Sequence, residues 1–265
     1  MSKLCEVLRV SRSGYYAWEK RPPGKRERKN EVLCEEIRRT FDENHRIYGG
    51  RKITEELSRP ERRVNRKRVA RLMKKMGLRS KVSKKYRATT NSKHNLPVAE
   101  NLLNREFSAA APNEKWVSDI TCVPTDEGWL YLAGIMDLCS REIVGWAMDS
   151  RMKTELCIGA LNQAILRRGN PNKVLLHSDR GSQYCSAVYQ AEIQKNRFIC
   201  SMSRKGNCWD NAPMESFWGK LKQEWLNDQH FSTRQEAMEA DFYYIELFYN
   251  RKRHHANISY AVSAL

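Results

Sequence analysis

The order of segments in the C-terminal half of the chain constrains the fold most strongly. Three β-rich stretches at 115–125, 128–138 and 142–149 are separated only by short turn sequences, and this arrangement predicts three consecutive antiparallel strands. An amphipathic helix at 154–169 follows, and then a short strand at 172–179 whose continuous apolar centre indicates burial on both faces. A strand that joins the sheet after a helix makes the sheet mixed.

The remaining segments complete a layered structure. Helices are predicted at 186–198, 212–228 and 233–249, with a short strand at 199–203. A mixed sheet flanked by helices accommodates all of these elements. Their order along the chain is that of an RNase H-like core, so we predict an RNase H-like α/β domain.

The excess positive charge is confined to the N-terminal part of the chain. The 265 residues include 48 Lys and Arg against 31 Asp and Glu, a net charge of +17. Residues 1–110 hold 30 of the basic and 13 of the acidic side chains, so the remainder of the chain is neutral. This asymmetry favours a nucleic-acid-binding module joined to a neutral domain. A basic surface that serves solubility alone is the ordinary alternative.

The basic part has the helical periodicity of a small DNA-binding module. Three short helices with tight turns, the last one strongly basic, are typical of a helix-turn-helix whose final helix enters the major groove. An ordinary helical bundle has the same spacing, so the confined charge decides in favour of DNA contact. The predicted DNA-binding residues of this module are Arg51, Lys52, Arg66, Lys67, Arg68, Arg71, Lys74 and Lys75.

These patterns divide the chain into four predicted regions. A helical segment with a Pro/Gly-rich linker occupies residues 1–29, and the helix-turn-helix module occupies 30–80, with its first helix starting at Asn30. A basic linker follows at 81–112, with a short helical element expected between Glu100 and Phe107. The small all-α module thus precedes the α/β domain at 113–265.

Three carboxylates stand at positions that suggest a joint role. Asp119 lies inside an alternating strand, Asp179 directly follows the apolar strand, and Glu215 falls in the first turn of a helix after Pro213. Each alone has an ordinary explanation: an edge strand facing water, a turn, or a favourable place in the helix dipole. Together they can converge at one edge of the sheet, where oxygen ligands suit Mg²⁺ or Mn²⁺. Two such ions ~3.5–4 Å apart support chemistry at phosphorus.

Basic residues near these carboxylates are candidates for holding DNA. Lys222 comes seven residues after Glu215, so it lies on nearly the same helix face, ~10 Å along the axis. Arg204 and Lys205 belong to a glycine-containing loop at 203–207 and are predicted to contact phosphates. The alternatives are a helical contact with an acidic neighbour for Lys222 and a simple surface loop for the other two.

Other candidates have weaker support. Asp137 and Asp149 compete with Asp119 for the first carboxylate position, although a hairpin explains Asp137 better. His177 is explained as a ligand, as a base or, more commonly for a buried strand, as a core histidine. The eight cysteines are dispersed without a C-x-x-C pair, which indicates reduced thiols of a cytosolic protein and neither a disulfide framework nor a zinc knuckle.

Asp119, Asp179 and Glu215, with 35 residues between the last two, and Lys222 resemble the DDE signature of retroviral-type integrases and transposases. Longer stretches are similar to the second-frame (OrfB) transposases of the insertion-sequence-three family. The likeness runs from about residue 5 to 255 and rests on the stretches "HRIYGGRKI", "WVSDIT", "YLAGIMDLCSREIVGWAM", "HSDRGSQY", "MSRKGNCWDNAPMESFWGKLKQE" and "YNRKRH".

The resemblance implies a metal-dependent DNA transposase. Asp119, Asp179 and Glu215 would be the catalytic residues and the ligands of two Mg²⁺ or Mn²⁺ ions, and the reaction would be end cleavage followed by strand transfer. The implied partners are double-stranded DNA (element ends and target), further copies of the chain in a homo-oligomer on DNA, and the upstream-frame (OrfA) product.

No apolar run approaches the ~20 residues needed to span a bilayer, so we expect no membrane association and a bacterial cytoplasmic, nucleoid-associated location. Two rival functions remain open. A catalytically inactive DNA-binding regulator would retain the fold, but the three intact carboxylates argue against it. A structure-selective RNase H-like nuclease would have no use for the basic helical module.

Overall fold

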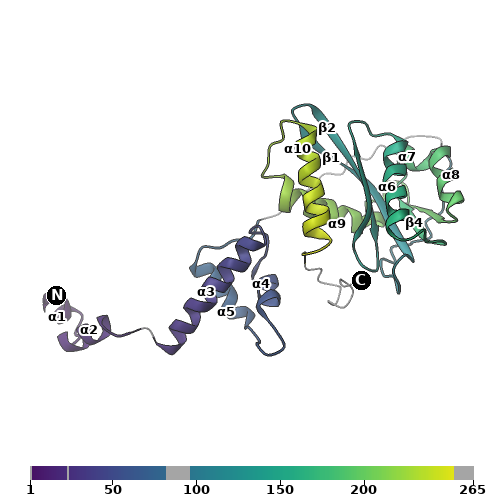
Figure 1. Cartoon of the computed structure of the whole chain (residues 1–265). Helices are drawn as coiled ribbons and strands as arrows, with labels where there is room; N and C mark the ends of the chain where they lie inside the picture. Colours follow the sequence, from purple (N-terminus) through teal and green to yellow (C-terminus); the bar gives the residue numbers. More distant parts are fainter. Residues whose placement is uncertain (1, 23, 82–95, 254–265) are drawn as a thin grey trace. The chain divides into compact units, whose positions relative to one another are not determined.

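The computed structural model describes residues 2–22, 24–81 and 96–253. The chain forms two compact units, Met1–Lys81 and Val82–Leu265, and each is described by itself (Figure 1).

Over the residues described, the first unit consists of helices and turns, with one isolated antiparallel bridge between Arg59 and Arg62. Three of its helices pack on one another through side chains that are almost completely buried, among them Ile37, Ile53 and Val69. The helices are α1 (Ser2–Val7), α2 (Arg12–Glu19), α3 (Lys25–Glu43), α4 (Gly50–Leu57) and α5 (Arg66–Lys75).

Helix α3 begins earlier than the apolar pattern predicts, at Lys25 instead of Asn30. Gly24 is the N-cap residue, and Glu27 lies in the first turn, where a negative charge interacts favourably with the helix dipole. The five residues before Asn30 are Lys, Arg and Glu, which have high helix propensity but carry no apolar periodicity.

The second unit is built on a five-stranded mixed sheet with the order β3-β2-β1-β4-β5. The first three strands pair as antiparallel neighbours, whereas β4 joins β1, and β5 joins β4, in parallel. This is the RNase H-like fold, as the sequence pattern predicts. The strands are β1 (Lys115–Thr125), β2 (Gly128–Asp137), β3 (Ile143–Asp149), β4 (Leu175–Ser178) and β5 (Ile199–Met202).

Helices cover both faces of the sheet (Figure 1). Helices α6 and α8 lie on one face, and α9 and α10 lie on the other. The helical elements are α6 (Thr154–Arg167), α7 (Ser182–Cys185), α8 (Ala187–Lys195), the 3₁₀ turn η1 (Cys208–Asn211), α9 (Ala212–Leu221), the π-helical turn η2 (Lys222–Leu226), α10 (Arg234–Phe242) and the π-helical segment η3 (Tyr243–Tyr249).

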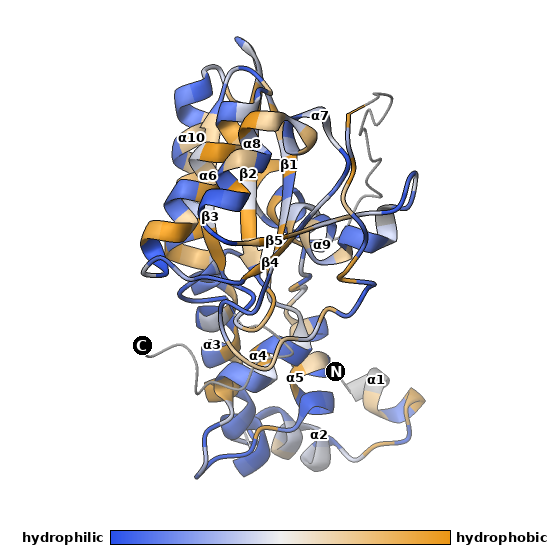
Figure 2. Cartoon of the chain, turned by 90° about the vertical axis from the view of Figure 1, so that its right-hand side faces the viewer, coloured by the Kyte–Doolittle hydropathy of each residue, from blue (hydrophilic) through white to orange (hydrophobic). Residues whose placement is uncertain are grey.

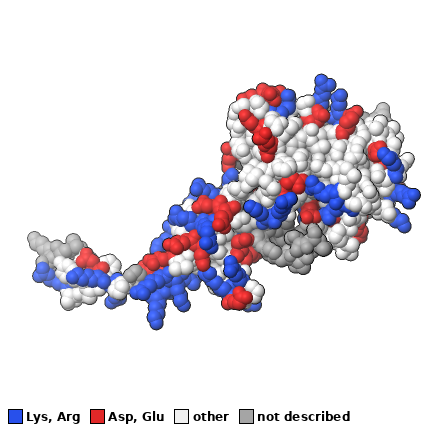
Figure 3. All heavy atoms as spheres, viewed as in Figure 1, with Lys and Arg blue, Asp and Glu red and all other residues white. Residues whose placement is uncertain are grey.

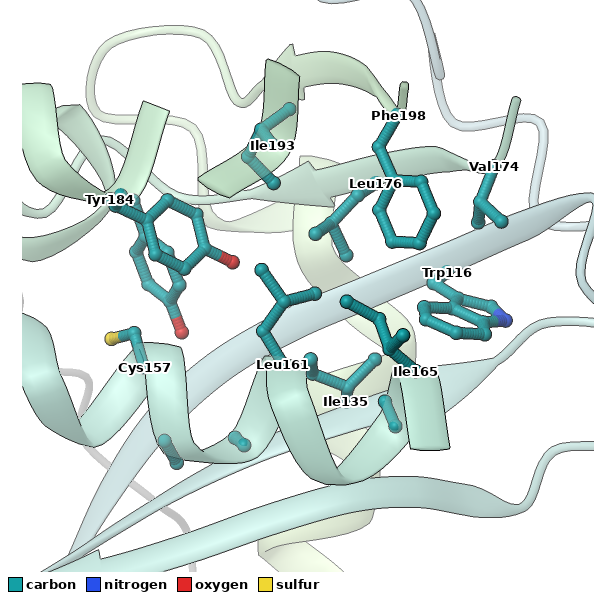
Figure 4. Packing of buried hydrophobic residues seen from close by; sticks show 14 of the residues in the cluster. Trp116, Ile135, Cys157, Leu161, Ile165, Val174, Leu176, Tyr184, Ile193 and Phe198 are labelled. Atoms are coloured by element: carbon teal, nitrogen blue, oxygen red, sulfur yellow. The ribbon is translucent and has the colours of Figure 1, made fainter. Parts of the chain in front are cut away.

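The main core lies between the sheet and α6 (Figure 4). Trp116 from β1 and Phe198 before β5 meet edge to face, with ring centroids 5.5 Å apart. Gly145 on β3 lets α6 approach closely, because a Cβ there would overlap Ala160 and Ala164. The central strands are mainly hydrophobic, whereas the outer surfaces of the helices are largely hydrophilic (Figure 2).

Part of the segment predicted to be a linker belongs to the second unit. Leu103 is buried there, and the backbone N–H groups of Leu102 and Leu103 donate to Ser201 Oγ. The short helix expected between Glu100 and Phe107 is wrong. Asn104 and Arg105 have φ of 43° and 62°, in the left-handed region that ends a helix. Residues 82–95 of the predicted linker lie outside the described part.

Across residues 2–22, 24–81 and 96–253, we find no helix with both the length and the apolar character needed to cross a membrane.

Candidate functional site

The parallel pairing of β1 and β4 brings two of the predicted carboxylates close together. The register pairs Val117 with His177, and Asp119 and Asp179 each follow two residues later, where the charge of Asp179 raises the pKa of Asp119. Neighbouring strands lie ~4.8 Å apart, and residues level with each other in a parallel pair point to the same face. The turn after β4 is held by Asp179 itself, whose Oδ1 accepts a hydrogen bond from Gly181 N over 2.8 Å.

An indole from α9 holds Asp119 in place. Asp119 pairs with Gly134 on β2, and a Cβ at Gly134 would lie 2.8 Å from Cη2 of Trp218. Because Gly134 has no side chain, the Trp218 indole can lie over this strand pair, where its Nε1 donates to Asp119 Oδ2 over 3.1 Å. The contact also fixes α9 against β1, and Glu215 lies one turn earlier on the same helix.

The third carboxylate, Glu215, lies in the first turn of α9 after Pro213. Burial raises the pKa of Glu215 above its ordinary value. The pKa of Asp119 lies well above its ordinary value, mainly because the carboxyl is buried. The charge of Asp179 and, to a smaller extent, that of Glu215 raise it further, whereas the hydrogen bond from Trp218 lowers it. The structure therefore brings Asp179 and Glu215 within electrostatic range of Asp119, whose negative charge both disfavour.

Within the described ranges, no three His, Cys, Asp or Glu side chains are already arranged around one point that could hold a metal ion. The donor set is nevertheless the type that a hard divalent cation prefers, since it consists of carboxylate oxygens alone. A cation would also relieve the repulsion that raises the pKa of Asp119.

A second carboxylate cluster organises the approach to α9. Asp210 in η1 is fully buried and accepts hydrogen bonds from Asn101 Nδ2 (2.9 Å), Arg105 Nε (2.8 Å) and the backbone and guanidinium nitrogens of Arg204 (2.8 to 2.9 Å). The hydrogen bonds from Arg204 above all hold the pKa of Asp210 well below its ordinary range. Two segments far apart in the sequence, 101–105 and 204–210, are thus tied together just before Glu215.

The residue after Asp210 connects this turn to the strand that carries Asp119. Asn211 Nδ2 donates to the backbone oxygen of Ser118 over 2.9 Å. Ser118 directly precedes Asp119, so the start of α9 is fixed relative to the carboxylate pair at two places, here and at Trp218.

His177 has a structural environment. Its ring nitrogens contact Ser201 Oγ (2.9 Å) and Ser203 Oγ (3.1 Å), and its side chain is fully buried. Burial lowers the pKa of His177 to about 4, so the ring is neutral near pH 7. These contacts agree with the core-histidine alternative.

Lys222 lies where α9 passes into the π-helical turn η2. Burial lowers the pKa of Lys222, and the charges of Cys122, Asp119 and Asp241 raise it, so its ammonium lies within electrostatic range of Asp119. Asp241 on α10 is fully buried, and its two oxygens accept no hydrogen bond from the residues described. Burial raises the pKa of Asp241 to about 8, against the opposing effect of Lys222.

Arg204 and Lys205, the two residues of the loop 203–207 that are predicted to contact phosphates, differ in their contacts. Arg204 pairs with Asp210 while 48% of its side chain stays exposed, so it has a structural contact and also faces solvent. Lys205 is exposed, and the loop turns at Gly206, whose φ of +70° favours glycine.

In the first unit, five of the predicted basic residues on α5 are exposed on the side opposite the buried Val69 and Leu72. They are Arg66, Lys67, Arg71, Lys74 and Lys75. Lys and Arg side chains cover much of the visible face of this unit, with acidic ones between them (Figure 3).

The other basic residues predicted to bind DNA make contacts inside the module. Arg68 Nε donates to Asn30 Oδ1 over 2.9 Å, and Arg51 Nε pairs with Glu55 over 2.9 Å. The Lys52 ammonium lies 4.8 Å from the centroid of the Tyr48 ring. These residues contribute to the packing of α3, α4 and α5 as well as to the charge.

The competing aspartates have local roles. Asp137 is fully buried at the end of β2 and accepts from Trp116 Nε1 and from the backbone of Asn113, Cys139 and Ser140. This is the hairpin role that the sequence favoured.

The sequence pattern did not single out Trp218, Gly134 and Asp210. The one local signal was Gly134, because an isolated glycine inside a strand often marks the close approach of another element.

The two units carry the features of a DNA-recombining enzyme class. Residues 27–86 match the family described as HTH-like domain, and residues 109–208 and 196–261 match two families described as Integrase core domain. The protein therefore combines a helix-turn-helix DNA-binding domain with an integrase core.

Relatives narrow this class further. The chain is 49% identical over 255 residues, 96% of this chain and 94% of the relative, to the insertion element IS600 uncharacterized 31 kDa protein of Shigella sonnei. It is 43% identical over 255 residues, 96% of this chain and 88% of the relative, to the transposase InsF for insertion sequence IS3A of Escherichia coli (strain K12). The chain belongs to the IS3-family transposases.

Among solved structures, the HTLV-2 integrase catalytic core domain in complex with magnesium is similar to this chain, with a TM-score of 0.45 and 18% sequence identity. The match covers 57% of this chain and 93% of that one.

Proposed function

We propose that this transposase cuts DNA at the ends of its insertion element and joins the freed 3′-OH to target DNA, with Asp119, Asp179 and Glu215 as the catalytic carboxylates. Water would hydrolyse one phosphodiester at the element's end. The 3′-OH so released would then attack a target phosphodiester and displace its 3′ oxygen, with no covalent protein intermediate. The observation that supports this proposal best is the electrostatic effect of both Asp179 and Glu215 on Asp119, which raises the pKa of Asp119.

The same three residues would hold Mg²⁺ or Mn²⁺, with two ions in the active complex. Bound divalent ions would supply Lewis-acid chemistry at the attacking and leaving oxygens. The chain's own contribution is to position the ligands. Trp218 orients Asp119, the Gly181 N–H orients Asp179, and the start of α9 presents Glu215.

Basic residues would place the DNA. Lys222, within electrostatic range of Asp119, would hold a phosphate near the carboxylates, and Arg204 and Lys205 would contact the strand beside them. The exposed basic face of α5 would bind the duplex. Lys74 and Lys75 lie in the last turn of α5, where they would contact phosphates at the C-terminal end of the helix. This placement is what in-line attack requires, because small misplacements of the reacting groups are costly in rate.

We further propose that the enzyme acts as a homo-oligomer at the bacterial nucleoid, with the upstream-frame (OrfA) product as a partner. Joining two ends of one element requires two active sites near each other, which a complex of several copies on DNA would supply.

A strand-transfer assay with duplexes of the element's end sequence, Mg²⁺ and labelled target tests the proposal, with and without the upstream-frame product. Asp119→Asn, Asp179→Asn and Glu215→Gln should each abolish cleavage and leave DNA binding nearly unchanged. Wild-type cleavage in any one variant would show that its residue is misassigned. Cleavage without joining would favour the nuclease alternative, and DNA binding alone would favour the inactive regulator.

A further inference from the structure

Trp209 is the most exposed tryptophan in the part of the chain that the structure describes. Its side chain belongs to η1, directly before α9, and the residue is 69% exposed, whereas Trp116 and Trp218 in the same unit are at most 1% exposed. An indole is a large apolar group, and leaving it in water forgoes a substantial burial free energy. An exposed indole beside a catalytic site therefore points to a ligand.

The turn that presents Trp209 is held by hydrogen bonds of the two residues that follow it. Its neighbour Asp210 is bound by Asn101, Arg105 and Arg204. The next residue, Asn211, donates to the Ser118 oxygen on β1, one residue before Asp119. The position of the Trp209 backbone relative to Asp119 is thus fixed by hydrogen bonds instead of by packing of the indole itself.

The charges around Trp209 favour a nucleic acid over an apolar protein surface. Arg204 is half exposed and Lys205 is exposed in the loop just before η1, while the one acidic neighbour, Asp210, is fully buried and paired with Arg204 and Arg105. Aromatic side chains beside basic ones form the usual binding surface for unpaired nucleotides, where bases stack on the ring and phosphates meet the cations.

The carboxylates add a reason for strand separation at this place. Asp119, Asp179 and Glu215 are each only partly exposed, and a separated strand, being thinner than a duplex, approaches partly buried groups more closely. Opening the base pair next to the cleaved bond frees the backbone to enter, at a cost of a few kcal/mol for unpairing and unstacking that a new stacking partner offsets.

We propose that Trp209 stacks on an unpaired nucleobase beside the phosphodiester that is cleaved at the element's end. The indole replaces the stacking that the base loses when it leaves the helix, and the opened strand reaches the carboxylates. The inference rests on the proposed cleavage function and names the substrate form that the site accepts, a DNA end with one splayed base. Since every base has a stacking face, the contact carries little sequence preference.

The test compares cleavage rates of full-length wild type, Trp209→Ala, Trp209→Phe and Trp129→Ala on end-sequence duplexes, with the upstream-frame product present in all arms. Trp129 is the matched control, since it is also exposed, at 52%, but lies at the start of β2, opposite Pro124 and away from Asp119. Melting temperatures of all variants establish that each is folded.

Stacking of a base on an aromatic ring is worth ~1–3 kcal/mol, which corresponds to about 5- to 160-fold in rate. Trp209→Ala should therefore lose about that much cleavage on the paired duplex, Trp209→Phe should recover most of it, and Trp129→Ala should match wild type. A mismatch beside the cleaved bond should restore part of the Trp209→Ala rate, because the unpairing cost is removed.

An abasic nucleotide, placed in turn at each position flanking the cleaved bond, identifies the stacked base. At one of these positions, wild type and Trp209→Ala should cleave at the same rate, since neither has a base to stack on. Equal rates for wild type and Trp209→Ala on the paired duplex would overturn the inference, as would a deficit that persists at every abasic position. If wild type cleaves no duplex at all, the proposed function fails and this inference falls with it.

Discussion

Replacing Trp218 by Phe tests how the fold sets the proton affinity of Asp119, the first of the three proposed catalytic carboxylates. The phenyl ring keeps most of the packing over Gly134 but removes the N–H that donates to Asp119 Oδ2 over 3.1 Å. That hydrogen bond lowers the pKa of Asp119, which burial and the neighbouring carboxylates raise. Without it the pKa rises further. A hydrogen bond to a charged group contributes ~1.5–3 kcal/mol, so its loss weakens the ionised form of Asp119 relative to the protonated form.

The sign of the effect follows from competition between protons and the metal. A higher pKa keeps Asp119 protonated up to a higher pH, and a protonated carboxyl is a poor metal ligand. The acidic limb of the cleavage rate against pH should therefore move to higher pH in Trp218→Phe. At a fixed pH on this limb, the Mg²⁺ concentration needed for half-maximal cleavage should rise by about tenfold per unit of that shift.

Trp225→Phe is the matched control for this experiment. Trp225 follows on the same helical run and stacks on Tyr243, with ring centroids 5.2 Å apart, so its substitution also removes an indole N–H but leaves Asp119 untouched. Its acidic limb should coincide with that of wild type. If the limb of Trp218→Phe also coincides with that of wild type, while both variants remain folded by thermal melting, the hydrogen bond has no influence on Asp119 and the reasoning is refuted.

Three further predictions follow from other contacts. Lys222→Ala should slow end cleavage by about 10- to 100-fold, because it removes one hydrogen bond to a phosphate. Lys222→Arg should retain most of the rate. Unchanged cleavage in the alanine variant would show that Lys222 does not contact DNA. Lys67→Ala and Arg71→Ala should each reduce the magnitude of the slope of log K against log salt for duplex binding by about 0.9. The control is Lys195→Ala, which should leave the slope unchanged, since Lys195 lies on the second unit and pairs with Glu192. Identical slopes in all variants would exclude α5 as the main duplex contact. The pKa of Asp241 rises from 3.8 to about 8 on folding, so this group favours the folded state at acidic pH and loses that contribution between about pH 4 and 8. The melting temperature of Asp241→Asn should therefore lie above that of wild type near pH 8 and close to it near pH 4. A constant difference in melting temperature across that range would contradict the raised pKa of Asp241.

Much of the fold follows from local patterns. The alternation in β1 and β2, the continuous apolar centre of β4 and the amphipathic period of α6 are each visible within a short window, because side-chain direction repeats every two residues in a strand and every 3.6 in a helix. The confined basic charge is equally local. Where local periodicity was weak, the prediction was wrong, as at residues 100–107, where left-handed Asn104 and Arg105 make a turn instead of a helix.

The order of the strands and helices, the family of the protein and the three carboxylates at positions suited to a metal can all be predicted from the sequence. How these residues are held depends on tertiary contacts. Trp218 forms a hydrogen bond with Asp119, 99 positions away in the chain, and Arg105 forms one with Asp210, 105 positions away. No period or motif encodes which indole meets which carboxylate, because such contacts depend on how the helices pack on the sheet and on the space that Gly134 leaves open. The same packing leaves Trp209 in solvent, although Asp210 and Asn211, which follow it, are buried.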